Sequence, residues 1–412
     1  MSDPVEVHVE CGDRIVQAGV LYSHRGRGTE SATFTYVDRY VSDPDAYALD
    51  PVLPVGLGRY QTPLGRSLFA AFSDCAPDRW GRMLLHKLEG RRAATEGTAT
   101  RALGEMDLLL GVRDDLRQGA LRLRTDGPFL AVDSDGVPAM AQLPELLDLA
   151  NRAEQAPETV PDADLCRLVH AGSSLGGARP KAHVMAPDGR IAIAKFPSGA
   201  HDTWDVMAWE KVALDLAGDS GIDVPPSQLV RIAGRSVLII DRFDRRGNER
   251  IGYVSALTML EAADGEQRSY LEIAEVIETR SVDSTDELAQ LWRRIAFSVF
   301  ISNTDDHLRN HGFLHASGDA WMLSPAFDLN PNPDPGPKHL STAIGAETEA
   351  TLDNVLRIAS SFRLGSAAAA AILDEIGEAV GRWRQVADRC GLSQSAIDAM
   401  APAFEHPGVT LA

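Results

Sequence analysis

The sequence predicts an α+β protein with two lobes and an additional N-terminal part. Alternating apolar and polar residues predict strands within residues 5–37, which favours a small N-terminal α/β subdomain. Between residues 182 and 240, two hairpin patterns flank one amphipathic helix, which is the layout of a small mixed β/α lobe. From residue 256 onward the long periodic segments are mostly helical, as expected for a large helical lobe.

The chain length is compatible with this division. The 412 residues, 44% hydrophobic and 24% charged, suffice for two or three domains with cores of their own. We expect an N-terminal subdomain over residues 1–125, the small lobe over 126–245 and the helical lobe over 246–412. Residues 154–164, rich in Pro, Glu and Asp, are the best candidate for a linker.

Charge and apolar patterning restrict the partners and the location. A net charge of −19 argues against direct nucleic-acid binding by this chain alone, because cationic side chains supply most of that affinity. No apolar run reaches the length of a bilayer span and no signal-peptide pattern opens the chain, so we expect a cytoplasmic protein without membrane association. The four cysteines have no metal-site spacing and are expected to be buried free thiols. One local basic stretch is expected to be a solvated helix face: Arg79, Arg82, Lys87, Arg91 and Arg92.

Individual elements follow from the same patterns, in chain order. N-terminal strands are expected at residues 5–9, 15–21 and 32–37, and a helical pattern at 68–88 with a turn at 74–78, then a short helix and a strand within 102–124. The small lobe should contain strands at 182–185, 191–196, 228–232 and 236–240 around a helix at 205–217. In the large lobe, helices are expected at 288–302 and 366–389, with a hairpin over 312–323.

Residues 303–328 carry the strongest chemical signal. Asp305 precedes Asn310 by five residues, and a strand, turn and strand separate Asn310 from Asp328. Protein kinases place a base Asp, a Mg²⁺-binding Asn and a second Mg²⁺-binding Asp in this order. The spacing therefore indicates a phosphoryl-transfer centre in a protein-kinase-like fold, with Asp305 as the base. Asp306, only four residues before Asn310, is expected to be a supporting or a surface carboxylate.

Residues 173–181 form a small-residue loop before the first strand of the small lobe. Gly176 and Gly177 allow backbone N–H groups to approach phosphate oxygens, and Lys181 adds positive charge. The loop is neither a Walker A sequence nor the common kinase glycine motif, and a plain turn is the alternative.

Three further positions follow the kinase order. Lys195 ends a strand and could pair with ATP phosphates and with Glu210 on the next helix, or could be a lysine at a solvent edge. Asp241 and Phe243 stand where the hinge between lobes would contact adenine, although a charged turn is equally compatible. His307, His311 and His315 are spaced by four, but the strand pattern between them favours a His307 that orients the catalytic loop over a zinc stripe.

Together these motifs resemble the HipA family, serine/threonine kinases that are toxins of bacterial toxin-antitoxin pairs. The resemblance covers most of the chain and is carried by residues 72–87, 173–182, 193–197, 209–210, 241–248, 303–313 and 323–331. It implies ATP and Mg²⁺ as cofactors, with Asp305 orienting or deprotonating the acceptor hydroxyl and Asn310 and Asp328 binding Mg²⁺. It also implies autophosphorylation of Ser174, with Ser173 as an adjacent alternative, which would add about −1.5 to −2 charges and eject the loop.

The resemblance extends to partners and to nucleotide contacts. It implies a HipB-like helix-turn-helix antitoxin that supplies DNA binding, and a protein substrate such as an aminoacyl-tRNA synthetase. Asp306 departs from the glycine common at its position, and Pro180 stands near the loop end. A small-molecule kinase and an ATP-binding pseudokinase remain alternatives. The residues expected around the nucleotide are Ser174, Gly176, Gly177, Ala178, Lys181, Lys195, Glu210, Asp241, Phe243, His307, Asn310 and Asp328.

Overall fold

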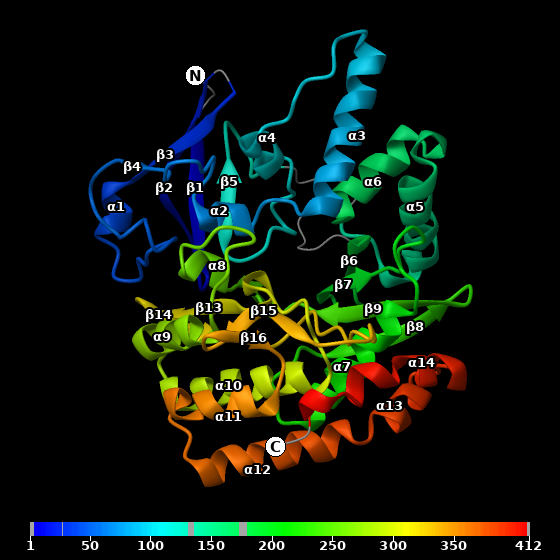
Figure 1. Cartoon of the computed structure of the whole chain (residues 1–412). Helices are drawn as coiled ribbons and strands as arrows, with labels where there is room; N and C mark the ends of the chain where they lie inside the picture. The colour runs from blue at the N-terminus through cyan, green and yellow to red at the C-terminus, as the bar shows by residue number, and fades with distance from the viewer. Residues whose placement is uncertain (1–3, 27, 131–135, 173–178, 410–412) are drawn as a thin grey trace. The chain divides into compact units, whose positions relative to one another are not determined.

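The computed structural model describes residues 4–26, 28–130, 136–172 and 179–409. The described residues form two compact units (Figure 1). The first comprises the described residues up to Asp202, together with Ile232–Arg235 and Asp241–Val254. The second comprises Thr203–Arg231, Ser236–Ile240 and the described residues from Ser255 onward. Where the three predicted domains begin and end stays a prediction.

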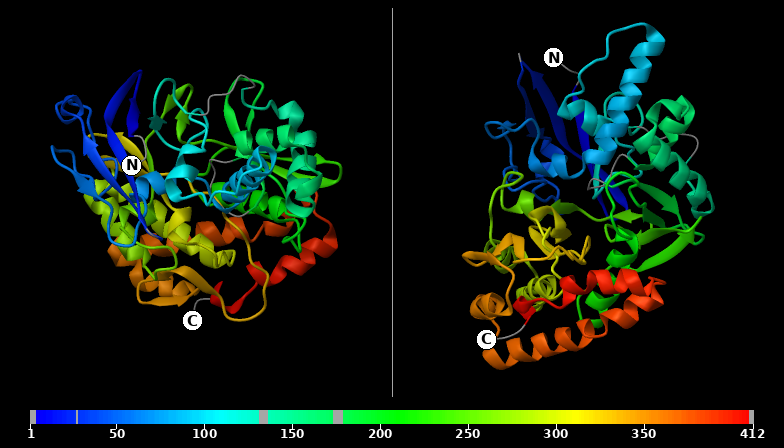
Figure 2. Two further views of the ribbon diagram at one scale, coloured as in Figure 1. Left: turned by 90° about the horizontal axis from the view of Figure 1, so that it is seen from above. Right: turned by 45° about the vertical axis from the view of Figure 1, so that its right-hand side comes forward.

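A five-stranded antiparallel sheet opens the first unit, with strand order β4-β3-β2-β1-β5. The blue strands β1 to β3 lie side by side in Figures 1 and 2. Gly19 on β2 has no room for a side chain, because a Cβ atom there would lie 2.4 Å from the Phe34 ring. The predicted N-terminal strands are confirmed as β1 Val5–Cys11, β2 Arg14–Arg25, β3 Glu30–Tyr36 and β5 Leu121–Arg124. The short strand β4 Tyr60–Gln61 was not predicted.

The predicted turn at residues 74–78 separates helix α2 from helix α3. Asp78 precedes α3 and caps it, because its carboxylate accepts a hydrogen bond from the Gly81 amide at 2.8 Å. The expected solvated basic face on α3 is present in part: Arg79 and Arg92 are exposed. Arg82 and Arg91 are half-buried and pair with Glu105 at 2.6 Å and Asp162 at 2.7 Å. The bounds are α1 Asp38–Val41, α2 Ala70–Asp74, α3 Arg79–Glu96, α4 Glu105–Leu110, α5 Leu143–Gln155 and α6 Asp162–Gly172, with short 3₁₀ turns η1 Met140–Gln142 and η2 Pro157–Thr159.

Residues 154–164 lie inside the first unit. They contain the end of α5, the turn η2 and the start of α6, so they connect two helices of one unit. After α6, strands β6 (Lys181–Met185) and β7 (Ile191–Lys195) form the predicted antiparallel hairpin. Three short strands complete this part of the chain: β10 Arg245–Arg246, β11 Glu249–Arg250 and β12 Tyr253–Ser255.

The second unit is mostly helical, as expected. Its core includes Trp209 on α7, whose ring lies 6.1 Å from Trp383, and Trp383 stacks on Phe404 at 4.5 Å. The helix expected over residues 366–389 is two helices with a break at Gly381. The bounds are α7 Val206–Asp219, α8 Ala256–Met259, α9 Tyr270–Arg280, α10 Ser284–Phe300, α11 Leu352–Ile358, α12 Ser366–Val380, α13 Trp383–Arg389 and α14 Gln394–Phe404.

Helices α10 and α12 pack against each other in this unit, and Figure 2 shows α12 in orange. The predicted hairpins at 228–240 and 312–323 are present. The strands are β8 Ser227–Ile232, β9 Arg235–Asp241, β13 Gly312–Ser317, β14 Ala320–Leu323, β15 His339–Ile344 and β16 Glu347–Glu349, and the 3₁₀ turns are η3 Leu308–Asn310, η4 Ala359–Phe362 and η5 Pro407–Val409.

Two further sequence expectations concern membranes and thiols. Within the described ranges, no helix combines the length and the apolar character that a bilayer crossing requires. All four cysteines are free. Only Cys75 is fully buried, whereas Cys11, Cys166 and Cys390 are partly exposed, so the expectation of buried thiols holds for one of the four.

Candidate functional site

The loop that contains Asp305 follows directly after the buried helix α10. Ser302, just beyond the helix end, has a φ of 52°, a left-handed conformation that turns the chain sharply. Asp305 is exposed, and the Asn310 side-chain amide donates to the Asp305 carbonyl at 3.1 Å. The five-residue spacing seen in the sequence therefore closes a compact loop, which brings Asn310 next to the backbone of Asp305.

The Asp328 segment is hydrogen-bonded to this same loop. The Asn330 amide donates to the Asn303 side chain at 3.2 Å, and the Asn332 side chain donates to the Thr304 hydroxyl at 2.9 Å. Asp328 itself has a φ of 59°, which is unusual for a residue other than glycine. Strained backbone of this kind concentrates at functional sites. The structure thus brings the loops of Asp305, Asn310 and Asp328 together within the second unit.

The donor set at these loops suits Mg²⁺ when nucleotide phosphates complete it. Mg²⁺ prefers oxygen ligands and is held in kinases by one or two carboxylates together with substrate phosphates. Among the described residues, no group of three or more His, Cys, Asp and Glu side chains is arranged to hold a metal ion. The Asn330 side-chain oxygen is buried and has no hydrogen-bond partner in the described part of the chain, so it can accept a hydrogen bond from a water of the ion.

Asp306 is buried, so the alternative of a surface carboxylate is wrong. Its carboxylate accepts hydrogen bonds from the Tyr270 hydroxyl and from the Ser298 hydroxyl at 3.1 Å, and His311 Nε2 lies 3.0 Å away. Burial raises the pKa of the Asp306 carboxyl, but His311, Tyr270 and Ser298 together hold it below its ordinary value. The neighbouring Asp305 is thereby attached to a fixed point of the unit.

Arg294 on α10 lies between the two loops. It is buried, and its guanidinium donates to the Ser324 carbonyl at 2.7 Å, four residues before Asp328. Its Nε and Nη1 atoms have no hydrogen-bond partner among the described residues. Burial lowers the pKa of Arg294 to about 10, while the charge of Asp306 opposes this shift. Arg294 therefore contributes to the placement of the Asp328 segment.

A hollow of about 410 Å³ lies beside the loop of residues 303–310, the predicted catalytic loop, in the second unit. Its lining includes His307, Leu308 and Arg309 of that loop, residues 263–268, and Ser341 and Thr342 of β15. The Ser341 hydroxyl donates to the Thr304 carbonyl at 2.9 Å, and the Thr342 hydroxyl donates to the Asp306 carbonyl at 2.7 Å. The wall of the hollow is thus fastened to the backbone on both sides of Asp305.

The predicted nucleotide-binding residues of the first unit lie on the hairpin β6–β7. Lys181 and Lys195 face each other in register across this hairpin. The Lys181 ammonium is buried and donates to the Asp78 carboxylate at 2.9 Å, which links the hairpin to the start of α3. Lys195 is half-buried at the end of β7. Glu210 is buried on α7 of the second unit, and its pairing with Lys195 stays a prediction.

The predicted hinge residues Asp241 and Phe243 alternate with residues of a buried ion cluster. Asp241 pairs with Arg190, and the Phe243 ring lies 6.1 Å from the Tyr253 ring. Between and beyond them, Arg242 and Asp244 are buried and bind each other at 2.6 Å. The motif at residues 241–245 is therefore more than a charged turn.

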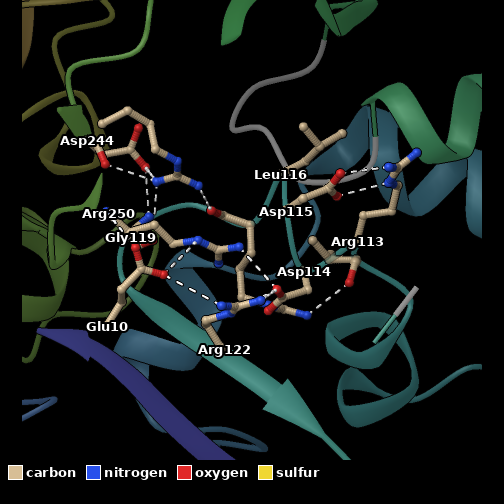
Figure 3. Close-up of polar contacts among 12 residues, drawn as sticks. Glu10, Arg113, Asp114, Asp115, Leu116, Gly119, Arg122, Asp244 and Arg250 are labelled. Atoms are coloured by element: carbon tan, nitrogen blue, oxygen red, sulfur yellow. Dashed lines mark hydrogen bonds and ion pairs between the residues drawn. The ribbon is translucent and has the colours of Figure 1, made fainter. Parts of the chain in front are cut away.

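This cluster joins segments that are far apart in the sequence (Figure 3). Asp244 accepts a hydrogen bond from the Gly119 amide at 2.8 Å. Arg250 reaches Asp114 at 3.1 Å and Glu10 at 3.6 Å. Burial raises the pKa of Asp244, yet Arg242 and Arg245 outweigh it and hold this pKa far below its ordinary value. The cluster thus attaches the N-terminal sheet to residues 241–250.

His183 on β6 extends the cluster to the hairpin β6–β7. Its Nδ1 lies 3.0 Å from the Ala171 carbonyl and its Nε2 lies 2.9 Å from an Arg242 nitrogen. Because Arg242 can only donate and the carbonyl can only accept, Nδ1 carries the proton of a neutral ring. Burial, reinforced by the positive charge of Arg242, lowers the pKa of His183 well below its ordinary value.

Several predicted residues lie outside the described part of the chain. These are Ser173, Ser174, Gly176, Gly177 and Ala178. Residues that the sequence reasoning missed are Asn303, Asn330 and Asn332, which hold the two loops together. The run of Asn residues around Pro331 and Pro333 was a usable signal, because Asn is favoured where side chains bond to nearby backbone.

Comparison with known proteins identifies relatives. The family model for the HipA-like C-terminal domain matches residues 173–384. A protein of Haemophilus influenzae named "Putative kinase" is 27% identical over 183 residues, which is 38% of this chain and 52% of the relative. Another from Sinorhizobium fredii, named "Putative kinase Y4dM", is 28% identical over 152 residues, which is 33% of this chain and 36% of the relative. The matches thus span about half or less of these curated relatives.

A solved structure shows the same fold. HipA of Shewanella oneidensis MR-1, determined in a complex with HipB and its operator DNA, superposes with a TM-score of 0.64 at 16% identity. The superposition covers 97% of this chain and 95% of that one. The mixed α/β fold is therefore that of HipA. Because the family model spans more than half of the sequence, this chain belongs to the family of proteins with a HipA-like C-terminal domain.

Proposed function

We propose that the protein is a serine/threonine kinase that transfers the γ-phosphoryl group of ATP to a protein substrate and acts as the toxin of a toxin-antitoxin pair. The observation that carries this proposal is the hydrogen-bonded assembly of the Asp305 loop with the Asp328 segment. Family membership and the names of the relatives support it. A small β/α lobe and a large helical lobe are the corresponding finer description of the fold.

In the proposed reaction, the acceptor hydroxyl oxygen forms a bond to the γ-phosphorus while the bond to the bridging oxygen of ADP breaks. Asp305 orients the hydroxyl and accepts its proton. Asn310 and Asp328 supply oxygen ligands for Mg²⁺, which would neutralise charge on the phosphates when bound. The hydrogen bonds that fix Asp305 relative to Asp328 provide positioning, which accounts for most of the catalysis in phosphoryl transfer.

The other proposed roles follow the kinase order. Lys195, oriented by Glu210, holds ATP phosphates, and the backbone at Asp241 and Phe243 contacts adenine. Ser174 is the proposed autophosphorylation site. A HipB-like protein is the proposed antitoxin, since the HipA of Shewanella was solved with HipB and operator DNA. An aminoacyl-tRNA synthetase is a candidate substrate, and a cytoplasmic location stays a prediction.

The test is phosphate incorporation from labelled ATP with Mg²⁺. We expect label in the chain itself or in a Ser/Thr substrate for the wild type, and a loss of at least about a hundredfold in Asp305→Asn and Asp328→Asn. Asp319→Asn, an exposed turn carboxylate in the same unit, is the matched control and should retain activity. Expression of the wild type and of Asp319→Asn should arrest growth, whereas expression of Asp305→Asn or Asp328→Asn should not. Full incorporation in Asp305→Asn and Asp328→Asn would refute the proposed centre.

A small-molecule kinase is less well supported. A cationic small substrate would call for a large acidic hollow in the helical unit. The hollow beside the catalytic loop instead carries two acidic residues, Asp264 and Glu266, and two basic ones, Arg268 and Arg309. This mixed charge favours a polypeptide substrate, whose backbone and side chains offer both kinds of partner.

A further inference from the structure

The hollow beside the catalytic loop is close to Asp305, the residue proposed to bind the acceptor hydroxyl of the substrate. His307, which lines it, is two residues after Asp305. Since consecutive Cα atoms are about 3.8 Å apart, the Cα atoms of these two residues lie within about 8 Å. We therefore expect the residue beside an acceptor hydroxyl that is bound at Asp305 to come close to the wall formed by His307 and Arg309.

The ion pair between Arg309 and Asp264 at this wall is open to replacement of Asp264 by another carboxylate. Arg309 Nε and Nη2 donate to the two Asp264 oxygens at 2.7 and 2.8 Å, the forked geometry in which arginine binds carboxylates. The Arg309 side chain is 37% exposed and that of Asp264 is 71% exposed. Because solvent reaches both side chains, an arriving carboxylate can replace Asp264 while water solvates the displaced group.

The second arginine of the hollow is engaged elsewhere. Arg268 contacts Glu272 at 2.6 Å and Glu266 at 3.1 Å. Glu272 also accepts the Ser269 amide at 2.9 Å and so closes the capping box that starts α9. Displacing these carboxylates would disturb the start of a helix. The pair of Arg309 with Asp264 is also more exposed than the pairs of Arg268, so a substrate can reach it more easily.

The two partners of the exchangeable pair are not equivalent. Arg309 belongs to the turn η3, and its neighbour Asn310 is hydrogen-bonded to Asp305. Asp264 belongs to the connection between α8 and α9 and is mostly exposed. A substrate carboxylate can take the place of Asp264 while Arg309 stays fixed. A substrate cation would instead have to remove Asp264 from the fixed guanidinium.

We propose that the hollow is a specificity subsite in which Arg309 binds an acidic side chain next to the acceptor Ser or Thr, and that Asp264 occupies this position until substrate binds. The inference rests on the proposed kinase function and adds a substrate class to it: proteins with Asp or Glu beside the phosphorylated residue.

The experiment compares labelled Ser peptides that differ only in one flanking residue: Glu, Gln or Lys. Binding to the full chain is measured by fluorescence anisotropy with Mg²⁺ and a non-hydrolysable ATP analogue, and phosphorylation with Mg²⁺ and ATP. We expect the Glu peptide to bind about three- to fivefold more tightly than the Gln peptide, with the same ratio in kcat/KM. Arg309→Gln should abolish this ratio, and Asp264→Asn should tighten binding of the Glu peptide.

Arg363→Gln is the matched control, because Arg363 is also an exposed arginine of the second unit and pairs with Glu278 at 3.2 Å. It should leave the ratio unchanged. Equal binding of the three peptides, tighter binding of the Lys peptide, or a Glu preference that survives Arg309→Gln would overturn the inference. Absence of phosphate transfer to any peptide and to the chain would contradict the proposed kinase function instead, and the anisotropy ratio would still decide on the subsite.

Discussion

Each unit of the protein buries carboxylates, but their partners differ. In the first unit, Asp114 and Asp244 are surrounded by arginines, so buried positive and negative charges compensate one another. In the second unit, Asp306 is held by two hydroxyls and a histidine. The arginines reach over long distances and join segments up to 240 residues apart, whereas the Asp306 partners are compact and hold one loop. Charge pairs thus serve connection, and hydrogen bonds serve local precision.

The largest effect is expected from a substitution that breaks the buried ion cluster of the first unit. Asp244→Asn removes the charge that Arg242 and Arg245 share while it leaves the shape nearly unchanged. We expect a loss of about 3–5 kcal/mol in unfolding free energy, because removal of one partner leaves buried charge uncompensated. Denaturant unfolding of the full chain measures this. A loss below about 1 kcal/mol would show that the cluster is not an important connection.

The next prediction tests whether the hydrogen bonds of Asp306 position the Asp305 loop in the second unit. Asp306→Asn keeps the side-chain size but weakens the bonds from Tyr270 and Ser298. We expect kcat to fall about a hundredfold with KM for ATP changed less than about twofold, since misplacement of a catalytic loop affects the transition state most. Tyr270→Phe should act in the same direction and less than additively with Asp306→Asn. Full kcat in a folded Asp306→Asn protein would contradict this role.

A third effect concerns the pH dependence of stability that His183 gives to the first unit. His183 is buried neutral, so as the pH falls below about 6.5 the unfolded chain binds a proton that the folded chain does not. The unfolding free energy should therefore decrease toward acid by about 1.4 kcal/mol per pH unit from this group. His183→Gln should remove this part of the slope between pH 7 and 5. An identical slope in both proteins would mean that His183 is not held neutral.

The smallest effect on unfolding free energy is expected for an exposed ion pair, which serves as the reference for the buried cluster. Arg363 and Glu278 are 3.2 Å apart, with side chains 48% and 42% exposed. Because solvent screens such a pair, Arg363→Gln should change the unfolding free energy by about 1 kcal/mol or less. The same denaturant experiment measures it. A loss as large as that of Asp244→Asn would remove the distinction between buried and exposed pairs.

The parts of the fold that the sequence predicted well depend on local patterns. Strand alternation located β1 to β3, and the offset between Asp305 and Asn310 located a loop that the structure closes with a hydrogen bond. Burial of Asp306 was not predictable, because its partners Tyr270 and Ser298 lie on helices 36 and 8 residues away and a lone carboxylate resembles a surface residue. Local sequence patterns do not indicate which distant residues will contact a given side chain in the fold.

The same limit explains the motif at residues 241–245. In sequence it is a charged turn, and only the fold reveals that Arg242 bonds to the Leu116 carbonyl, 126 residues earlier. The helix over 366–389 was overextended because its start is alanine-rich, although Gly381, where α12 ends, was a usable signal for a helix end.

The bond between Gly119 and Asp244 has a consequence for biosynthesis. The two residues are 125 positions apart, and a ribosome adds about 5–20 residues per second. Gly119 and the arginine-rich surface around it therefore wait roughly 6–25 seconds for Asp244 to be translated. During this interval the Gly119 amide lacks the carboxylate that it binds in the folded protein, so this connection forms only after the N-terminal sheet has been translated.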